Sequence, residues 1–341
     1  MTLEADPPVI VRQQGRIGRL TINRPKALNA IDHAMVQSLR GALDGWRHDP
    51  AVEAVVIEGV GDRAFCAGGD IRRVRDMALA GQNAEVEAFF ADEYALNLDI
   101  AHYPKPYIAL IDGVCMGGGM GLSIHGRARI VTDAAVLAMP ETGIGFFPDV
   151  GASFFLPRLP GHHGMFLALT GARVQGAEAV NLGLATHYVA RDGIATLADE
   201  MAESGTVALA RAAQPLPTSI SREHAKVVAC FGADSVVGIV KRLAELASAP
   251  AQDASSTLRS RSPTAVLRTF ELMRLGAGRT LGQCLKMELA LTRHAVRHPD
   301  FAEGVRAMVV DKDRNPCWSP ARIEDVPLDE IKGLFRQFGA G

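Results

Sequence analysis

The stretch Gly113-Val-Cys-Met-Gly-Gly-Gly-Met-Gly-Leu-Ser123 sets three consecutive glycines between an apolar strand and a helix of small residues. Residues 108–111 (Ile-Ala-Leu-Ile) supply the strand pattern. Backbone N–H groups without partners collect where a helix begins, and the helix dipole adds positive potential there. Gly117, Gly118 and Gly119 could therefore hold a developing oxyanion. Glycine runs also form turns and close-packing points, so that alternative stays open.

Two acids follow in the segment Met139-Pro-Glu-Thr-Gly-Ile-Gly-Phe-Phe-Pro-Asp-Val-Gly151. Apolar surroundings keep the pKa of a carboxyl group near its working range, and two neighbouring carboxyl groups push their pKa values apart. The glycines and Pro148 exclude a plain helix, so the segment could fold Asp149 back towards Glu141. The alternatives are a solvated charge for Glu141 and, for Asp149, a cap on a helix at 151–156.

A second glycine junction lies upstream in Phe65-Cys-Ala-Gly-Gly-Asp-Ile71. One N–H from Ala67-Gly68-Gly69 and one from the triple glycine could meet over a single oxygen, which is the geometry of a two-donor oxyanion hole. Cys66 and Cys115 flank these junctions. Their small, apolar neighbours favour buried packing residues over nucleophiles.

Composition indicates an ordinary globular protein. The 341 residues are 48% hydrophobic and 22% charged, with a formal net charge of -2, so charge gives no argument for nucleic acid or membrane partners. Five scattered cysteines suit a reducing compartment. The N-terminal residues are acidic and lack the apolar segment of a signal peptide. We therefore expect a soluble, cytoplasmic protein.

Strand and helix patterns alternate along the first two hundred residues, beginning with a hairpin at 9–22, and this alternation predicts an α/β layer structure. Beyond about residue 206 strand signals nearly vanish. We expect a core domain at 1–205 and a helical C-terminal region at 206–341. The helices expected there are 222–231, 235–247, 263–276, 281–298 and 301–309, and the clearest polar break between them is 249–256.

Several familiar motifs are missing from the sequence. It has no dinucleotide or nucleoside-triphosphate loop and no Gly-x-Ser-x-Gly elbow around Ser123. His294 and His298 have the spacing of metal ligands, but they lack the adjacent Glu of a zinc hydrolase. We expect no metal site.

Four segments, in order, resemble the crotonase (enoyl-CoA hydratase/isomerase) superfamily: Asn23-Arg-Pro-Lys-Ala-Leu-Asn-Ala30, Phe65–Ile71, Met116-Gly-Gly-Gly119 and Met139-Pro-Glu141. Within it, the segments Glu141–Gly151 and Phe301-Ala-Glu-Gly-Val-Arg-Ala-Met-Val-Val-Asp-Lys-Asp313 resemble the 3-hydroxyisobutyryl-CoA hydrolases of valine breakdown. The likeness covers nearly the whole chain.

The resemblance implies a crotonase-like spiral of ββα turns with helices at its C-terminal end, and an acyl-CoA substrate. It implies no cofactor, because the coenzyme A belongs to the substrate. The N–H groups of Ala67 and Gly118 would hold the thioester carbonyl oxygen, and Glu93 would contact the acyl hydroxyl; as an alternative, Glu93 is a solvated charge on a helix. The residues implied to bind CoA are Lys26, Ala27, Leu28, Gly69, Asp70 and Ile71.

One departure separates two activities of the superfamily. Hydratases of this fold carry a Glu two residues after the triple glycine, where this chain has Gly121. Glu141 and Asp149 instead match the hydrolase pattern. Glu141 would act as nucleophile or as general base, and Asp149 would orient it or protonate the departing thiolate.

Two other functions stay open at the level of sequence. One is an enoyl-CoA hydratase or isomerase, which Gly121 disfavours. The other is a non-catalytic CoA-binding or RNA-binding relative, although the near-neutral charge disfavours RNA. Homo-oligomers are common among such cores, but the helical C-terminal region could replace those contacts.

Overall fold

The structure of the chain is a computed structural model that describes residues 7–212 and 222–339. The chain forms two compact units. The described part of the first unit comprises residues 7–70, 92–137 and 174–212, and that of the second comprises 71–91, 138–173 and 222–339. These bounds differ from a division near residue 205, because the units interleave along the chain.

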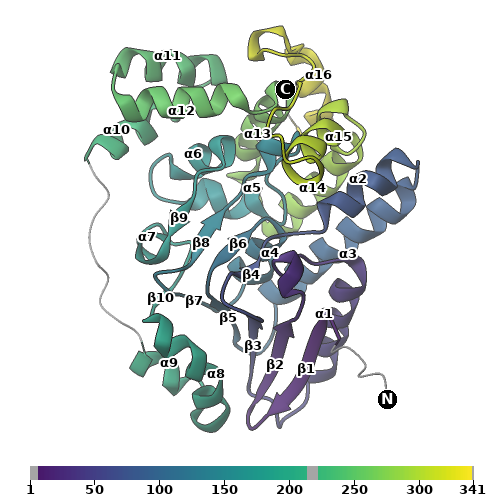
Figure 1. The fold of residues 1–341 in the computed structure, drawn as a ribbon, viewed down its shortest axis with the longest axis vertical. Helices are drawn as coiled ribbons and strands as arrows, with labels where there is room; N and C mark the ends of the chain where they lie inside the picture. The colour runs from purple at the N-terminus through teal and green to yellow at the C-terminus, as the bar shows by residue number, and fades with distance from the viewer. Residues whose placement is uncertain (1–6, 213–221, 340–341) are drawn as a thin grey trace. The chain divides into compact units, whose positions relative to one another are not determined.

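A six-stranded sheet forms the centre of the first unit (Figure 1). Its order is β1-β2-β3-β5-β7-β10, with β1 antiparallel to β2 and the remaining neighbours parallel. The strands are β1 (Val9–Gln14), β2 (Ile17–Ile22), β3 (Ala54–Gly59), β5 (Tyr107–Ile111), β7 (Ala128–Val131) and β10 (His187–Tyr188). The expected hairpin is confirmed, and its turn uses Gly15 at φ +53°.

Helix α8 (Arg191–Ser204) packs on this sheet through one apolar stripe. Leu197, Ala198 and Met201 of α8 join Val56 and Ile130 of the sheet in one buried cluster. The spacing of three and four residues within α8 places these side chains on one helix face. Burial of this stripe is what attaches the helix to the sheet.

A second sheet of the same unit carries both glycine junctions. Its order is β4-β6-β8-β9, comprising β4 (Ala64–Cys66), β6 (Val114–Met116), β8 (Val136–Ala138) and β9 (Val174–Gln175). Strands β4 and β6 are parallel neighbours. Because parallel strands end at the same edge of a sheet, the turns that follow them lie close together.

The apolar pattern at 108–111 predicts one strand before the triple glycine, and the structure has two, β5 and β6. Gly113 separates them at φ +74°, and a Cβ there would lie 2.4 Å from the Arg63 carbonyl oxygen. The break therefore follows from a close backbone approach that hydrophobic periodicity does not reveal.

The first unit has further helices besides α8. They are α1 (His33–Trp46), α3 (Asn83–Ala101, which belongs to this unit from Asp92 on), α4 (Gly118–Ile124), α7 (Gly176–Asn181) and α9 (Val207–Ala212). Asp32 caps the start of helix α1, because its side chain accepts from the Met35 N–H at 3.0 Å.

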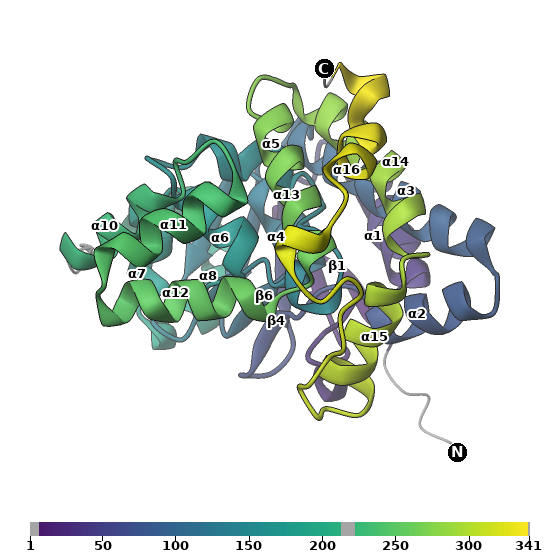
Figure 2. The same ribbon diagram turned by 90° about the horizontal axis from the view of Figure 1, so that it is seen from above.

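The second unit is helical. Its helices are α2 (Ile71–Leu79), the start of α3, α5 (Ala152–Phe155), α6 (His163–Thr170), α10 (Arg222–Cys230), α11 (Val236–Leu246), α12 (Ala249–Ser260), α13 (Pro263–Gly276), α14 (Leu281–Ala295), α15 (Pro299–Val305) and α16 (Leu328–Phe335). Helices α11 and α12 lie side by side (Figure 2), and α13 contacts α5, α6 and α16. The expected helical C-terminal region is confirmed within the described residues.

The expected polar break at 249–256 is wrong, because these residues form helix α12. Pro250 lies in its first turn, where a backbone N–H needs no helical partner. Ala251, Ala254 and Leu258 follow at spacings of three and four and are buried. Because many of its side chains are small or hydroxylated, the amphipathic pattern of this helix is hard to recognise in the sequence.

Two further helix ends differ from expectation. The helix expected to reach His298 ends at Ala295, and the one expected to begin at Phe301 begins at Pro299 and continues into a π-helical turn at Arg306–Val310. None of the helices in the described ranges is long and apolar enough to cross a membrane.

Candidate functional site

The two glycine turns converge within the first unit. A Cβ built on Gly118 would lie 3.2 Å from the Gly69 nitrogen, and one built on Gly68 would lie 3.6 Å from the Gly118 nitrogen. The backbone N–H groups of two segments fifty residues apart are therefore neighbours. Such a pair of donors is what a carbonyl oxygen gaining negative charge requires.

The upstream N–H expected to act as a donor, that of Ala67, already has an acceptor in the structure. The Ala67 N–H donates to the Leu28 carbonyl oxygen at 3.0 Å. Gly68, at φ +109°, then turns the chain. The Gly69 N–H makes no hydrogen bond with any residue of the described ranges. The sequence could not reveal this, because the acceptor for Ala67 comes from a separate loop.

Gly118 is the first residue of α4, so its N–H has no acceptor within the helix. The preceding Gly117 has φ +50° and ψ -119°, a conformation that suits glycine. A Cβ on Gly119 would lie 2.3 Å from the Cys66 carbonyl oxygen. Glycine is therefore required at Gly119 for the two turns to approach each other.

Cys66 and Cys115 are fully buried beside these turns. Burial raises the pKa of the Cys115 thiol to about 12 and raises that of Cys66 further. Both thiols stay protonated at neutral pH and are poor nucleophiles. Their expected role as packing residues is confirmed.

Glu93 of α3 reaches the same place, so it is not a solvated charge. It is 2% exposed, and its Oε1 would lie 2.6 Å from a Cβ on Gly118. One helical turn further on, Asn97 is fully buried, and its side-chain amide has no hydrogen-bond partner among the described residues. Buried polar groups without partners are uncommon and recur at binding sites.

The loop implied to bind CoA is held by two residues that sequence reasoning did not single out. The Asn29 side chain donates to the carbonyl oxygens of Val60 (3.0 Å) and Ala64 (2.8 Å). Arg24 pairs with Asp70 at 3.2 Å and donates to the Ala30 carbonyl oxygen at 2.8 Å. Both lie in the quoted Asn23–Ala30 segment, where Arg24 directly precedes Pro25.

The residues implied to contact CoA lie as follows. Lys26 and Ala27 are exposed in a short 3-10 turn at Pro25–Ala27, so the ammonium group can meet an anion. Leu28 follows in the left-handed backbone region, at φ +50°. Gly69 and Asp70 are half-buried at the end of the upstream turn. Ile71 begins α2 and belongs to the second unit.

Glu141 and Asp149 both belong to the second unit and are buried, at 7% and 5% exposure. Glu141 opens a 3-10 turn (Glu141–Ile144), and the Phe146 N–H then donates to the Glu141 carbonyl oxygen at 3.0 Å. Phe146 stacks on Phe147 at 4.4 Å between ring centroids. The irregular, apolar segment that the sequence predicted is confirmed.

A carboxylate from the C-terminal helices meets the start of α5. It is Glu288 of α14, which accepts from the N–H groups of Gly151 and Ser153. Sequence reasoning missed Glu288. The signal was a charged residue on the apolar face of its helix, between Cys284 and Leu291.

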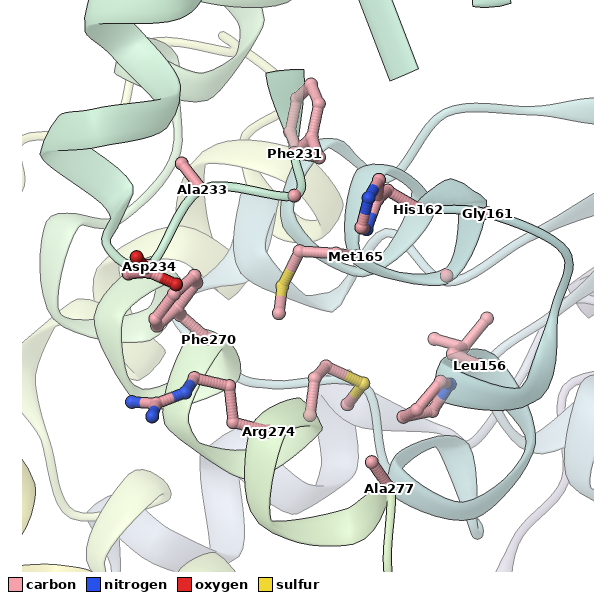
Figure 3. A pocket seen from close by; sticks show the side chains of 14 residues that line it. Leu156, Gly161, His162, Met165, Phe231, Ala233, Asp234, Phe270, Arg274 and Ala277 are labelled. Carbon is pink, nitrogen blue, oxygen red and sulfur yellow. The ribbon is translucent and has the colours of Figure 1, made fainter. Parts of the chain in front are cut away.

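A separate pocket of about 250 Å³ lies within the second unit (Figure 3). Met165 points into it, Phe231 and Phe270 contribute apolar walls, and Asp234 and Arg274 lie on one side. None of the residues expected to act in catalysis or CoA binding lines this pocket. Residues 7–212 and 222–339 contain no group of three or more His, Cys, Asp and Glu that could hold a metal ion.

Comparison with known proteins assigns the class. A family model described as enoyl-CoA hydratase/isomerase matches residues 17–335, and the chain belongs to this family. Its curated relatives include the protein named 3-hydroxyisobutyryl-CoA hydrolase, mitochondrial. The one from Xenopus tropicalis is 41% identical over 98% of this chain and 90% of its own length, and the one from Homo sapiens is 38% identical over 99% and 90%. The resemblance inferred from sequence is confirmed.

Solved structures confirm the α/β crotonase-like fold. A carnitinyl-CoA dehydratase from Mycobacterium thermoresistibile has a TM-score of 0.92 at 39% identity, covering 97% of this chain and 96% of its own. An enoyl-CoA hydratase from Rhodobacter sphaeroides has a TM-score of 0.88 at 38% identity, covering 96% and 97%. The names of the curated relatives include a mitochondrial location; the cytoplasmic location expected for this chain stays a prediction.

Proposed function

We propose that this protein hydrolyses a short β-hydroxyacyl-CoA thioester, with 3-hydroxyisobutyryl-CoA as the substrate and 3-hydroxyisobutyrate and CoA as the products. The observation that carries the proposal is the distribution of carboxyl groups. Glu141 and Asp149 are buried in apolar surroundings, whereas the hydratase position holds Gly121. The names of the curated relatives support the same substrate.

In the proposed reaction the thioester carbonyl oxygen accepts hydrogen bonds from the N–H groups of Gly69 and Gly118. Charge develops on this oxygen when the carbonyl carbon is attacked, so fixed donors stabilise the transition state more than the substrate. Loss of one such donor in other enzymes costs about 2.7–4 kcal/mol of barrier. Two donors therefore supply a large part of the rate enhancement.

Glu141 provides the attack. As a general base it takes a proton from water, whose oxygen bonds to the acyl carbon. As a nucleophile it forms a mixed anhydride that water then cleaves. In both routes the carbon–sulfur bond breaks, and the CoA thiolate takes up a proton. We assign Asp149 the role of orienting Glu141 and supplying that proton.

Glu93 is proposed to recognise the β-hydroxyl of the acyl group. Its carboxyl group borders Gly118 and is almost fully buried. A buried polar group that pairs with a substrate hydroxyl discriminates strongly against analogues without it. Substrates that lack the hydroxyl are therefore expected to react more slowly.

The rival activity is hydration or dehydration of an acyl-CoA, as in the titles of the two similar solved structures. A hydratase of this fold uses two carboxyl groups to hold the water that it adds. The chain lacks the first of these, because Gly121 has no side chain. This single position favours the hydrolase.

The test follows two signals in parallel: release of free CoA thiol from 3-hydroxyisobutyryl-CoA, and loss of enoyl absorbance from crotonyl-CoA. We expect thiol release without enoyl loss. Glu141→Gln should lower thiol release at least 100-fold, because the amide neither attacks nor accepts a proton. Glu245→Gln, on the exposed face of α11, is the matched control and should leave the rate unchanged. Enoyl loss without thiol release would overturn the proposal.

A further inference from the structure

The chain leaves Asp149 through two successive residues in the left-handed backbone region. Val150 has φ +52° and Gly151 has φ +87°. A β-branched residue rarely adopts this conformation, which costs about 1–3 kcal/mol. Backbone of this kind persists only where the surroundings hold it in place. The turn after Asp149 therefore needs an anchor.

Glu288 is that anchor. Its Oε2 accepts from the Gly151 N–H at 2.7 Å. Its Oε1 accepts from the Ser153 N–H at 3.0 Å and from the Ser153 hydroxyl at 2.5 Å. Glu288 is fully buried and reaches this turn from 137 residues further along the chain. Both oxygens of one side chain are thus committed to a segment that begins two residues after Asp149.

Neighbouring helices hold Glu288 and the turn against each other. A Cβ on Gly276, at the end of α13, would lie 2.0 Å from the Ser153 carbonyl oxygen, so this helix touches the turn directly. The Thr292 hydroxyl donates to the Glu288 backbone carbonyl at 2.9 Å, one turn further along α14. The arrangement leaves Glu288 little freedom.

We propose that Glu288 is a positioning residue for Asp149, because its carboxyl group locks the strained Val150–Gly151 turn and so fixes the backbone from which the Asp149 side chain projects. This inference rests on the function proposed above, in which Asp149 works with Glu141. Displacement of a reacting group by 1 Å can cost on the order of 100-fold in rate. The lock therefore acts on kcat more than on substrate binding.

The charge of Asp149 also affects the pKa of Glu288. Burial raises the pKa of Glu288 to about 8, and the nearby Asp149 charge acts in the same direction, against the hydrogen bonds from Ser153 and Gly151. Another titratable neighbour is Cys284, whose thiol pKa is raised by burial and, in addition, by Glu288; Ser153, Arg158 and Arg279 act on that thiol in the opposite direction. Glu288 is therefore expected to change charge near pH 8.

The first test compares Glu288→Gln, Ser153→Ala and the exposed control Glu245→Gln. In Glu288→Gln one acceptor oxygen becomes an NH₂ group facing an N–H donor. We expect kcat for 3-hydroxyisobutyryl-CoA to fall about 10-fold or more, with KM changed less than about threefold. Ser153→Ala removes one bond only and should give a smaller loss. A folded Glu288→Gln variant whose kcat stays within twofold of the wild type overturns the proposal.

The second readout separates positioning from general support of the fold. We expect the wild type to show a change of slope in log kcat near pH 8 that is missing in Glu288→Gln. In Ser153→Ala the change should move to higher pH, because the lost hydroxyl favoured the ionised form. An identical pH profile in all three proteins would contradict the proposal.

A third readout does not depend on turnover. Amide hydrogen exchange at Gly151 and Ser153 should be at least tenfold faster in Glu288→Gln than in the wild type or Glu245→Gln. If no thioester releases CoA, the proposed function fails, and exchange at these amides alone decides whether Glu288 locks the turn. Unchanged exchange would refute the lock even in an active enzyme.

Discussion

A methyl group added to Gly118 by substitution with alanine would disturb both the Glu93 side chain and the pair of N–H donors. The carbon would lie 2.6 Å from Glu93 Oε1 and 3.2 Å from the Gly69 nitrogen. Glu93 would have to move, and the space between the two N–H donors would narrow. The backbone conformation of Gly118 itself is helical, so the substitution adds no strain in φ.

We therefore expect Gly118→Ala to lower kcat/KM for 3-hydroxyisobutyryl-CoA at least 100-fold, corresponding to about 2.7 kcal/mol or more, as for loss of one oxyanion donor. Steady-state kinetics with thiol detection measures this loss. Gly41→Ala is the control: a Cβ there meets nothing within 4 Å, and the residue lies exposed in α1. It should keep full activity and raise stability by up to about 1 kcal/mol. Equal activity of the two variants would refute the role of Gly118.

Some residues of the site could be predicted from the sequence, and others could not. The glycine junctions and the acid pair could be singled out, because their residue types and order are unusual, and Glu93 was implied by the resemblance to the hydrolases. The choice between Ala67 and Gly69 could not, since it depends on the Leu28 carbonyl oxygen in another loop. Glu288 could not be predicted for a similar reason: its partners lie 135 and 137 residues away in the sequence.

At the scale of elements, helix α14 begins with a complete capping box. The Thr280 hydroxyl accepts from the Gln283 N–H at 3.3 Å, and the Gln283 side chain accepts from the Thr280 N–H at 3.0 Å. Two N–H groups that would otherwise lack partners are satisfied together. This box sets the start of the helix that carries Glu288.

Thr280→Ala should lower the free energy of unfolding by about 1 kcal/mol, because it removes the side-chain acceptor for Gln283. Urea denaturation measures the change. Ser256→Ala, in the exposed face of α12, serves as the control and should leave stability unchanged or slightly raised, since alanine favours a helix interior. A Thr280→Ala variant as stable as the wild type would show that packing alone holds the first turn.

Elements with a clear apolar period could be predicted, and those decided by backbone contacts could not. Helices α11 and α13 follow spacings of three and four and were found close to their expected bounds. The division of β5 from β6 depends on the approach of Gly113 to Arg63. Helix α12 was missed because its buried positions include only small side chains and one leucine.

At the scale of the whole molecule, pH acts on stability through two sets of carboxyl groups. Hydrogen bonds from Arg293, His33 and Arg306 lower the pKa of Glu87, Asp92 and Glu303, respectively. A lowered pKa in the folded state means that the unfolded state binds more protons in acid. This stabilisation is present above the ordinary carboxyl range and is lost as the pH falls through the lowered values.

We therefore expect the melting temperature to fall as the pH drops below about 4, and to fall less steeply at high salt, because these pairs are partly open to solvent. Glu288 acts with the opposite sign: its pKa is raised from 4.5 to about 8. Its contribution is complete below pH 4.5 and declines as the pH rises towards 8. Glu288→Gln should flatten that decline in calorimetry, whereas a slope equal to that of the wild type would contradict the raised pKa.

Because the two units interleave along the chain, a single cut cannot separate them. Residues 71–91 and 138–173 cluster with the C-terminal helices although they lie between segments of the sheet-bearing unit. A fragment ending near residue 205 would carry both segments without the helices they join, exposing their apolar side chains. We therefore expect that neither half folds on its own. A chimera with another family member would keep its units intact only if several segments were exchanged together.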